Sequence, residues 1–121
     1  MHYNLKGTNL ELTNPNRNYV EKRIRPLDKF LSRKTSARLD IELEFLDGEE
    51  KKYRAEGTLH DHGLEGDFRA EATGSTLHEA IDLMTHEIGM ELSRTKKRII
   101  DDKRKGALLF KNIIRGFTDR F

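Results

Sequence analysis

The sequence predicts an α+β fold in which two helices pack on one face of a four-stranded sheet, in the order β-α-β-β-β-α. Apolar and polar residues alternate over four short segments, apolar residues recur every three or four positions over two longer ones, and short turns join the last three strands. Because each helix and the sheet have one apolar face, the helices must share one side of the sheet, which gives a two-layer sandwich. A chain of 121 residues can bury the core that such a domain needs.

The first strand and the first helix are expected near the N-terminus. Residues 2–6 alternate, with Tyr3 and Leu5 in phase, which predicts a short strand. Thr13 is a suitable N-cap for a helix, and Pro26 inside that helix removes a backbone hydrogen bond and predicts a kink. The apolar face of the helix follows spacings of three or four and consists of Val20, Ile24, Leu27 and Leu31.

Three strands with short connections are expected next, over residues 37–45, 51–60 and 66–73. Asp47-Gly48 predicts a hairpin turn between the first two of them. Such neighbours should form an antiparallel sheet with one solvated face, on which acidic and basic residues interleave and can pair across strands. Small residues on the inner face, such as Gly57, would let a helix approach the sheet closely.

A long amphipathic helix is predicted over about residues 76–100, with Ser75 as its cap. The charged residues 101–106 predict a break, and apolar and basic residues then recur at helical spacing to the end of the chain. We therefore expect a domain over 1–100 and a basic amphipathic C-terminal tail over 101–121. This tail is too short for a core of its own, so it must dock on the domain, another chain, RNA or a membrane surface.

The charges are segregated along the chain, although the net charge is only +2. Residues 1–36 hold eight basic and three acidic residues, net +5, and residues 93–121 hold ten and three, net +7. The middle, 37–92, holds five and fifteen, net −10. Two basic ends around an acidic middle indicate a polyanionic partner, with a merely solvated surface as the alternative.

Both helices carry rows of cations. The first helix has a basic stripe opposite its apolar face, with the spacing that suits the repeated phosphates of nucleic acid. This stripe consists of Lys22, Arg25, Lys29 and Arg33. The second helix ends in Arg94, Lys96, Lys97 and Arg98. Cations at a helix C-terminus also stabilise the helix dipole, so the second row has a structural explanation as well.

Catalytic and metal-binding motifs are missing from the sequence. It has no cysteine, no phosphate-binding glycine loop and no serine in a nucleophile elbow, so we expect neither an enzyme nor a cofactor. His60-Asp61-His62 would need further ligands to hold a metal ion. No apolar stretch suggests a signal peptide or a membrane span, so a cytoplasmic protein is expected.

Three stretches in order along the chain resemble the ribosome hibernation-promoting factor and ribosome-associated translation inhibitor family, also called sigma-54 modulation proteins, in its short form. They are residues 13–30, Phe68–Ala72 and Leu77–Asp82, within a resemblance that covers about residues 2–98. The resemblance implies a fold similar to double-stranded RNA-binding domains. It also implies that the chain blocks translation by binding small-subunit rRNA in the channel for mRNA and tRNA.

The family's contacts to rRNA come from basic residues of both helices. The positions that match them here are Arg17, Arg23, Lys29, Arg94 and Arg98. Together with the periodic rows they give a candidate rRNA-binding set of Arg17, Lys22, Arg23, Arg25, Lys29, Arg33, Arg94, Lys97 and Arg98. The second helix departs from the family pattern at Glu87 and Met90, where the family has lysine and arginine.

Two other functions remain open on sequence alone. The chain could be a protein-interaction module of the same fold that forms a homodimer or binds a partner through its hydrophobic tail, residues 106–121. A free double-stranded RNA binder is disfavoured, because such proteins tend to place lysines at a helix N-terminus and the second helix begins Ser75-Thr76-Leu77-His78-Glu79.

Overall fold

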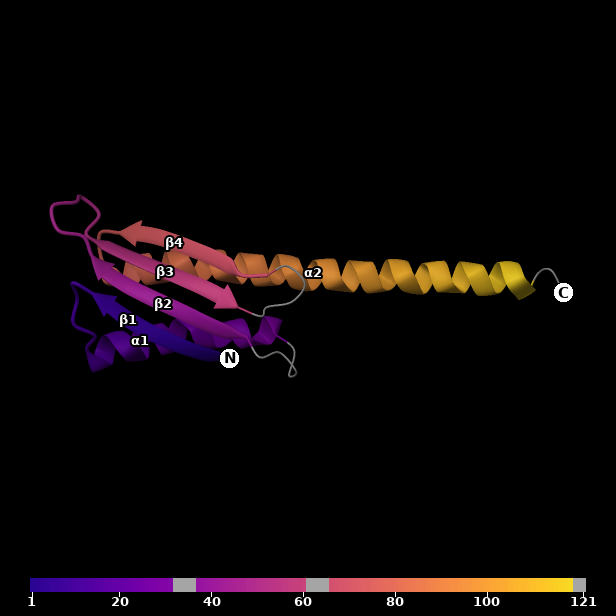
Figure 1. Cartoon of the computed structure of the whole chain (residues 1–121), viewed down its shortest axis with the longest axis horizontal. Coiled ribbons are helices and arrows are strands. Elements are labelled where there is room, and N and C mark those ends of the chain that lie inside the picture. Colours follow the sequence, from indigo (N-terminus) through magenta and orange to yellow (C-terminus); the bar gives the residue numbers. More distant parts are fainter. Residues whose placement is uncertain (32–36, 61–65, 119–121) are drawn as a thin grey trace.

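The computed structural model describes the backbone of residues 1–31, 37–60 and 66–118. Its elements follow the predicted order β-α-β-β-β-α, with a short 3-10 helix after the first helix (Figure 1). They are β1 (His2–Thr8), α1 (Asn14–Ile24), the 3-10 helix η1 (Arg25–Phe30), β2 (Arg38–Phe45), β3 (Tyr53–His60), β4 (Phe68–Gly74) and α2 (Leu77–Thr118). Among these residues, no helix has the length and apolar character needed to cross a membrane.

The four strands form one sheet in the order β1-β2-β3-β4. β2, β3 and β4 are antiparallel neighbours, as predicted, and the register places Leu39 opposite Leu59 and Gly57 opposite Ala70. β1 runs parallel to β2, with His2 opposite Arg38. The parallel pairing is possible because α1 and η1 lie between β1 and β2 in the chain. They run back across the sheet, so that β2 begins at the same end of the sheet as β1.

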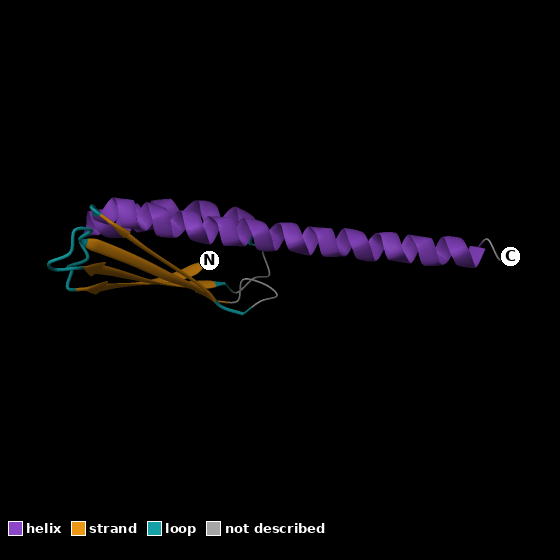
Figure 2. Cartoon of the chain, turned by 90° about the horizontal axis from the view of Figure 1, so that it is seen from above, coloured by secondary structure: helices purple, strands orange, loops and turns teal. Residues whose placement is uncertain are grey.

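Both helices cover the same face of the sheet, and none of the described helices lies on the other face (Figure 2). The core lies between the two layers. Its largest fully buried side chains are Leu39, Leu43, Leu59, Ile81, Met84, Ile88, Leu92 and Val20. A Cβ atom added to Gly57 would lie 2.8 Å from Ile88 Cδ1 and 3.1 Å from Met84 Sδ. This glycine therefore sets how closely α2 approaches the sheet, as the sequence predicted.

The first helical segment changes character at the proline. Thr13 caps α1 as predicted, because its hydroxyl accepts a hydrogen bond from the Asn16 backbone N–H at 3.3 Å. The α-helix ends at Ile24, and the chain continues through Pro26 as the 3-10 helix η1. The predicted disturbance at Pro26 thus takes the form of a tighter helical turn that keeps Leu27 buried.

Two details predicted for the second helix were wrong. Its cap is Thr76, not Ser75, because the Thr76 hydroxyl accepts the Glu79 backbone N–H at 3.1 Å. The predicted break at 101–106 does not occur, and α2 continues to Thr118. The segment holds no proline, and the one glycine costs about 1 kcal/mol relative to alanine, which does not end a helix.

The last part of α2 projects past the sheet (Figure 1). The structure gives the backbone of this extension but not its side chains beyond Lys105, so where the expected tail docks stays a prediction. The division into a domain over 1–100 and a tail over 101–121 also stays a prediction.

Candidate nucleic-acid interface

The cations predicted in the first helical segment lie on its solvent side. Val20, Ile24 and Leu27 are buried against the core, and the cationic residues between them are exposed. These exposed residues are Arg17, Lys22, Arg23, Arg25 and Lys29. Lys22 and Arg25 border one shallow hollow on the outer surface. Arg33 lies outside the described residues.

The fold brings the second basic row beside the first. Lys96, near the middle of α2, donates a hydrogen bond from Nζ to the backbone carbonyl of Lys29 in η1 at 3.3 Å. Arg94 and Lys97 are exposed on the same stretch of α2, and Arg98 is partly exposed. The two basic ends of the sequence, which are 67 residues apart at this contact, thus share one surface of the helical layer.

The candidate cations differ in how far neighbouring carboxylates neutralise them. Arg25 pairs with Glu21 at 2.9 Å and Arg94 pairs with Glu91 at 3.4 Å. The Arg25 pair has both partners exposed and is worth about 0.5 kcal/mol, so a phosphate can replace Glu21 at small cost. In the Arg94 pair the Glu91 side chain is largely buried.

The lysines of the set are different. Within the described parts of the chain, no carboxylate lies within ion-pair distance of Lys22, Lys29 or Lys97. All three lysines are exposed, so their ammonium groups are accessible from solvent.

Arg23 has a structural role that the sequence did not reveal. Its guanidinium pairs with Asp82 of α2 at 2.8 Å, and the same carboxylate accepts a hydrogen bond from the Tyr19 hydroxyl at 2.7 Å. The Tyr19 ring stacks on the His78 ring, with centroids 3.7 Å apart and planes 7° apart. The hydrogen bond to Asp82, with partial burial, raises the pKa of Tyr19. Arg23 thus helps to join α1 to α2.

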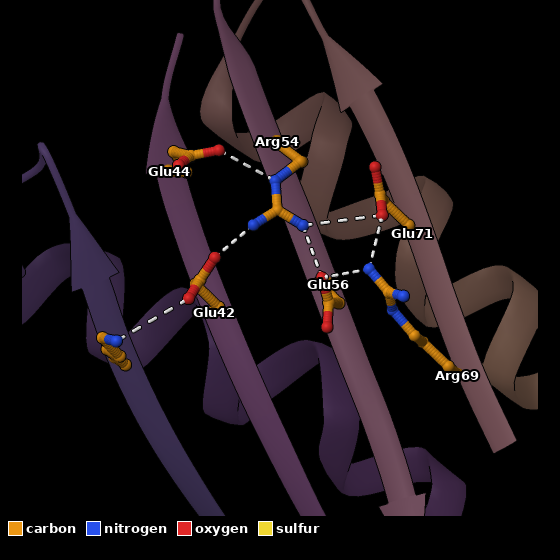
Figure 3. Close-up of polar contacts among 7 residues, drawn as sticks. Glu42, Glu44, Arg54, Glu56, Arg69 and Glu71 are labelled. Carbon is orange, nitrogen blue, oxygen red and sulfur yellow. Dashed lines mark hydrogen bonds and ion pairs between the residues drawn. The ribbon is translucent and has the colours of Figure 1, made fainter.

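The exposed face of the sheet carries a network of acidic and basic side chains (Figure 3). Arg54, whose side chain is 15% exposed, is surrounded by carboxylates from three strands. The residues of this network are Glu42, Glu44, Arg54, Glu56, Arg69 and Glu71. The predicted cross-strand pairing of acids and bases is confirmed.

The network shifts the pKa values of its members. Burial lowers the pKa of Arg54, but hydrogen bonds to Glu44 and Glu56 outweigh this and raise it above its usual value. Hydrogen bonds from Arg69 and Arg54 lower the pKa of Glu56. Both arginines of this network are thus paired with carboxylates, which outnumber them, whereas the helical face keeps lysines without carboxylate partners among the described residues.

The histidine cluster predicted as insufficient for a metal site is only partly described. His60 contacts Asp40 through Nε2 at 3.0 Å and Asp67 through Nδ1 at 2.9 Å. Asp61 and His62 lie outside the described residues. Among the residues that the structure describes, no group of three histidine, cysteine or acidic side chains is placed to hold a metal ion.

Comparison with known proteins agrees with this architecture. The family described as sigma 54 modulation protein / S30EA ribosomal protein matches residues 3–100, which is most of the chain. The chain belongs to this family. The matched region covers the four strands, α1, η1 and α2 as far as residue 100. It ends before the part of α2 that projects past the sheet.

Relatives of the S30EA family support the assignment. The chain is 31% identical over 104 residues to a ribosome hibernation promotion factor of Deinococcus radiodurans, covering 86% of this chain and 53% of that protein. It is 32% identical to a ribosome hibernation promoting factor of Azotobacter vinelandii, covering 84% and 88%. The crystal structure of the Thermus thermophilus Protein Y N-terminal domain aligns with a TM-score of 0.66 and 33% identity, covering 78% and 98%. The chain thus spans about half the length of the Deinococcus relative.

Proposed function

We propose that this S30EA-family chain inhibits translation by binding rRNA of the small ribosomal subunit, in the channel that mRNA and tRNA use. The observation that carries this proposal is the convergence of the two basic ends of the sequence on one face of the helical layer, at the Lys96–Lys29 contact. The names of the relatives, ribosome hibernation factors, support a ribosomal partner. Such binding would take place in the cytoplasm and needs no catalytic step.

The binding works through charge and shape. Lys22, Lys29 and Lys97 stand in water without carboxylate partners in the described chain, so each can contact a phosphate and release condensed counterions. Arg25 can exchange its exposed partner Glu21 for a phosphate. Lysine and arginine contacts to phosphate position a protein without reading bases, which suits a factor that occupies a folded RNA channel.

The proposal is tested by co-sedimentation of the full chain with purified small ribosomal subunits. The variant Lys22→Gln/Arg25→Gln/Lys29→Gln removes three cations from the proposed surface and should lose binding. A matched control, Lys6→Gln/Lys51→Gln/Lys52→Gln, removes the same charge from exposed positions of β1 and the β2–β3 connection and should bind as the natural chain does. Equal binding by both variants would contradict the proposed surface.

One observation favours a second function, a protein-interaction module that dimerises through residues 106–121. The helix backbone continues to Thr118 and projects past the sheet, and this stretch is rich in apolar residues (Figure 1). Light scattering of the full chain and of a chain ending at residue 105 tests this function. A dimer that becomes a monomer on truncation would support it, and equal monomer masses would contradict it.

A further inference from the structure

A groove lies between η1 and α2, next to the cations of the proposed rRNA surface. Phe30 of η1 forms one wall, and residues from four turns of α2 form the rest. Its lining consists of Phe30, His86, Gly89, Met90, Ser93, Arg94 and Lys97. Gly89 contributes no side chain, which keeps the groove open between the two helical segments.

The floor of this groove is apolar and exposed. Met90 is 50% exposed, although its apolar side chain would be stabilised by burial away from water. Phe30 packs against the core and is only partly buried. An aromatic ring and a thioether together form a flat, polarisable surface.

The rim of the groove is cationic. Arg94 and Lys97 line it directly, and Lys29 Nζ lies over the Phe30 ring, 5.0 Å from its centroid, so this flexible side chain has to move aside when a base stacks there. Lys96 Nζ is held nearby, 3.3 Å from the Lys29 carbonyl oxygen. Arg94 also pairs with Glu91 at 3.4 Å; the Arg94 side chain is exposed, whereas the Glu91 side chain is largely buried.

We propose that this groove binds one unpaired nucleotide of single-stranded RNA, with the base on Phe30 and Met90 and the adjacent phosphates on Arg94 and Lys97. A free phosphate would leave the apolar floor unused, and an apolar peptide would bury the rim cations without partners. A nucleotide satisfies both, because stacking on an aromatic ring and a cationic path for the backbone are the two elements of single-strand binding sites. This inference rests on the proposed binding of RNA by the chain.

Glu87 and Met90 are the two positions of α2 at which the sequence departs from the pattern of the family that it resembles. The resemblance implies an arginine at position 90 in the family, and in the proposed site Met90 would contact a base instead. Glu87 lies on the exposed side of α2 and does not line the groove. The contact between Met90 and a base would partly compensate for the phosphate contacts that a lysine at position 87 and an arginine at position 90 would make.

The test uses the full chain and a uridine hexanucleotide that carries one central 2-aminopurine, whose fluorescence falls when the base stacks. The natural chain should quench the fluorescence, and Phe30→Leu, which keeps apolar volume against the core, should remove the quenching and weaken binding about fivefold or more. Met90→Gln should weaken binding as well. Leu83→Gln is the matched control, since Leu83 is a similarly exposed apolar residue of α2 (44%) outside the groove, and it should change nothing.

Parallel co-sedimentation with small subunits separates the two proposals. Two results would overturn the groove assignment and leave the proposed ribosomal function standing. One is that the Phe30→Leu variant still quenches the fluorescence, and the other is that the natural chain binds small subunits but does not quench it. A chain that binds neither the subunits nor the oligonucleotide would overturn both.

Discussion

The salt dependence of binding gives the most quantitative test of the proposed surface. Lys22, Lys29 and Lys97 have no carboxylate partner among the described residues, so each should release its share of counterions when it contacts a phosphate. Each contact contributes about 0.7 to 0.9 to the slope of log affinity against log salt. The variant Lys22→Gln/Lys29→Gln/Lys97→Gln should therefore have a slope whose magnitude is roughly 2 to 3 lower than that of the natural chain.

This difference in slope corresponds to a measurable difference in affinity. Between about 50 mM and about 200 mM salt, the natural chain should lose roughly 20 to 40 times more affinity than the triple variant. The assay is binding of a fluorescently labelled chain to small subunits across that range. Arg23→Gln serves as the comparison, because Arg23 is already paired with Asp82 at 2.8 Å and should change the slope less than any one of the lysines.

The result that would refute this reasoning is a triple variant with the slope of the natural chain. Such a result would mean that the three lysines stay solvated in the complex and that other residues contact the phosphates. An Arg23→Gln slope change as large as that of a lysine variant would contradict the view that Asp82 retains Arg23 in the complex.

Three further predictions concern stability. Gly57→Ala places a Cβ atom 2.8 Å from Ile88 Cδ1 and should lower the free energy of unfolding in urea by about 1 to 3 kcal/mol; an unchanged midpoint would contradict the close approach of α2. Tyr19→Phe removes the 2.7 Å hydrogen bond to Asp82 and should cost about 0.5 to 1.5 kcal/mol in the same assay without loss of subunit binding. Glu56 has a lowered pKa in the folded chain, so its contribution is complete above its ordinary value of 4.5 and is lost as the pH falls through the lower folded value. Glu56→Gln should therefore flatten the fall of the melting temperature below about pH 4.5, and an unchanged profile would refute this.

Local patterns were sufficient to predict most of the elements. Alternation identified β2 because Leu39 and Ile41 face the core while Asp40 and Glu42 face water. The Thr13 cap and the change at Pro26 follow from hydrogen bonds within one helical turn, so they are readable in the sequence. The same local reasoning failed at 101–106, since a run of charged residues looks like a loop yet costs a helix little when it contains no proline.

Contacts between distant segments could not be predicted in this way. The pairing of β1 with β2 depends on the path of α1 and η1, and the hydrogen bond from Tyr19 to Asp82 spans 63 residues. The basic stripe was predicted from spacing alone, and the described part of it is exposed. The sequence could not distinguish Lys22, which has no carboxylate partner in the described chain, from Arg23, which joins the helices. That distinction needs the position of α2.

The division of charge between the two faces explains how a chain of net charge +2 can bind a polyanion. On the sheet, Arg54 and Arg69 are each paired with carboxylates, and the pairing fixes them in the folded state. Little positive charge is therefore left on this face to attract phosphate, and its carboxylates would repel it. The helical face keeps lysines in water, and lysine is a strongly hydrated point charge that does not require a planar partner. In the proposed complex, phosphate attraction on one face and repulsion on the other would orient the chain before contact, and the acidic residues would disfavour the reversed orientation.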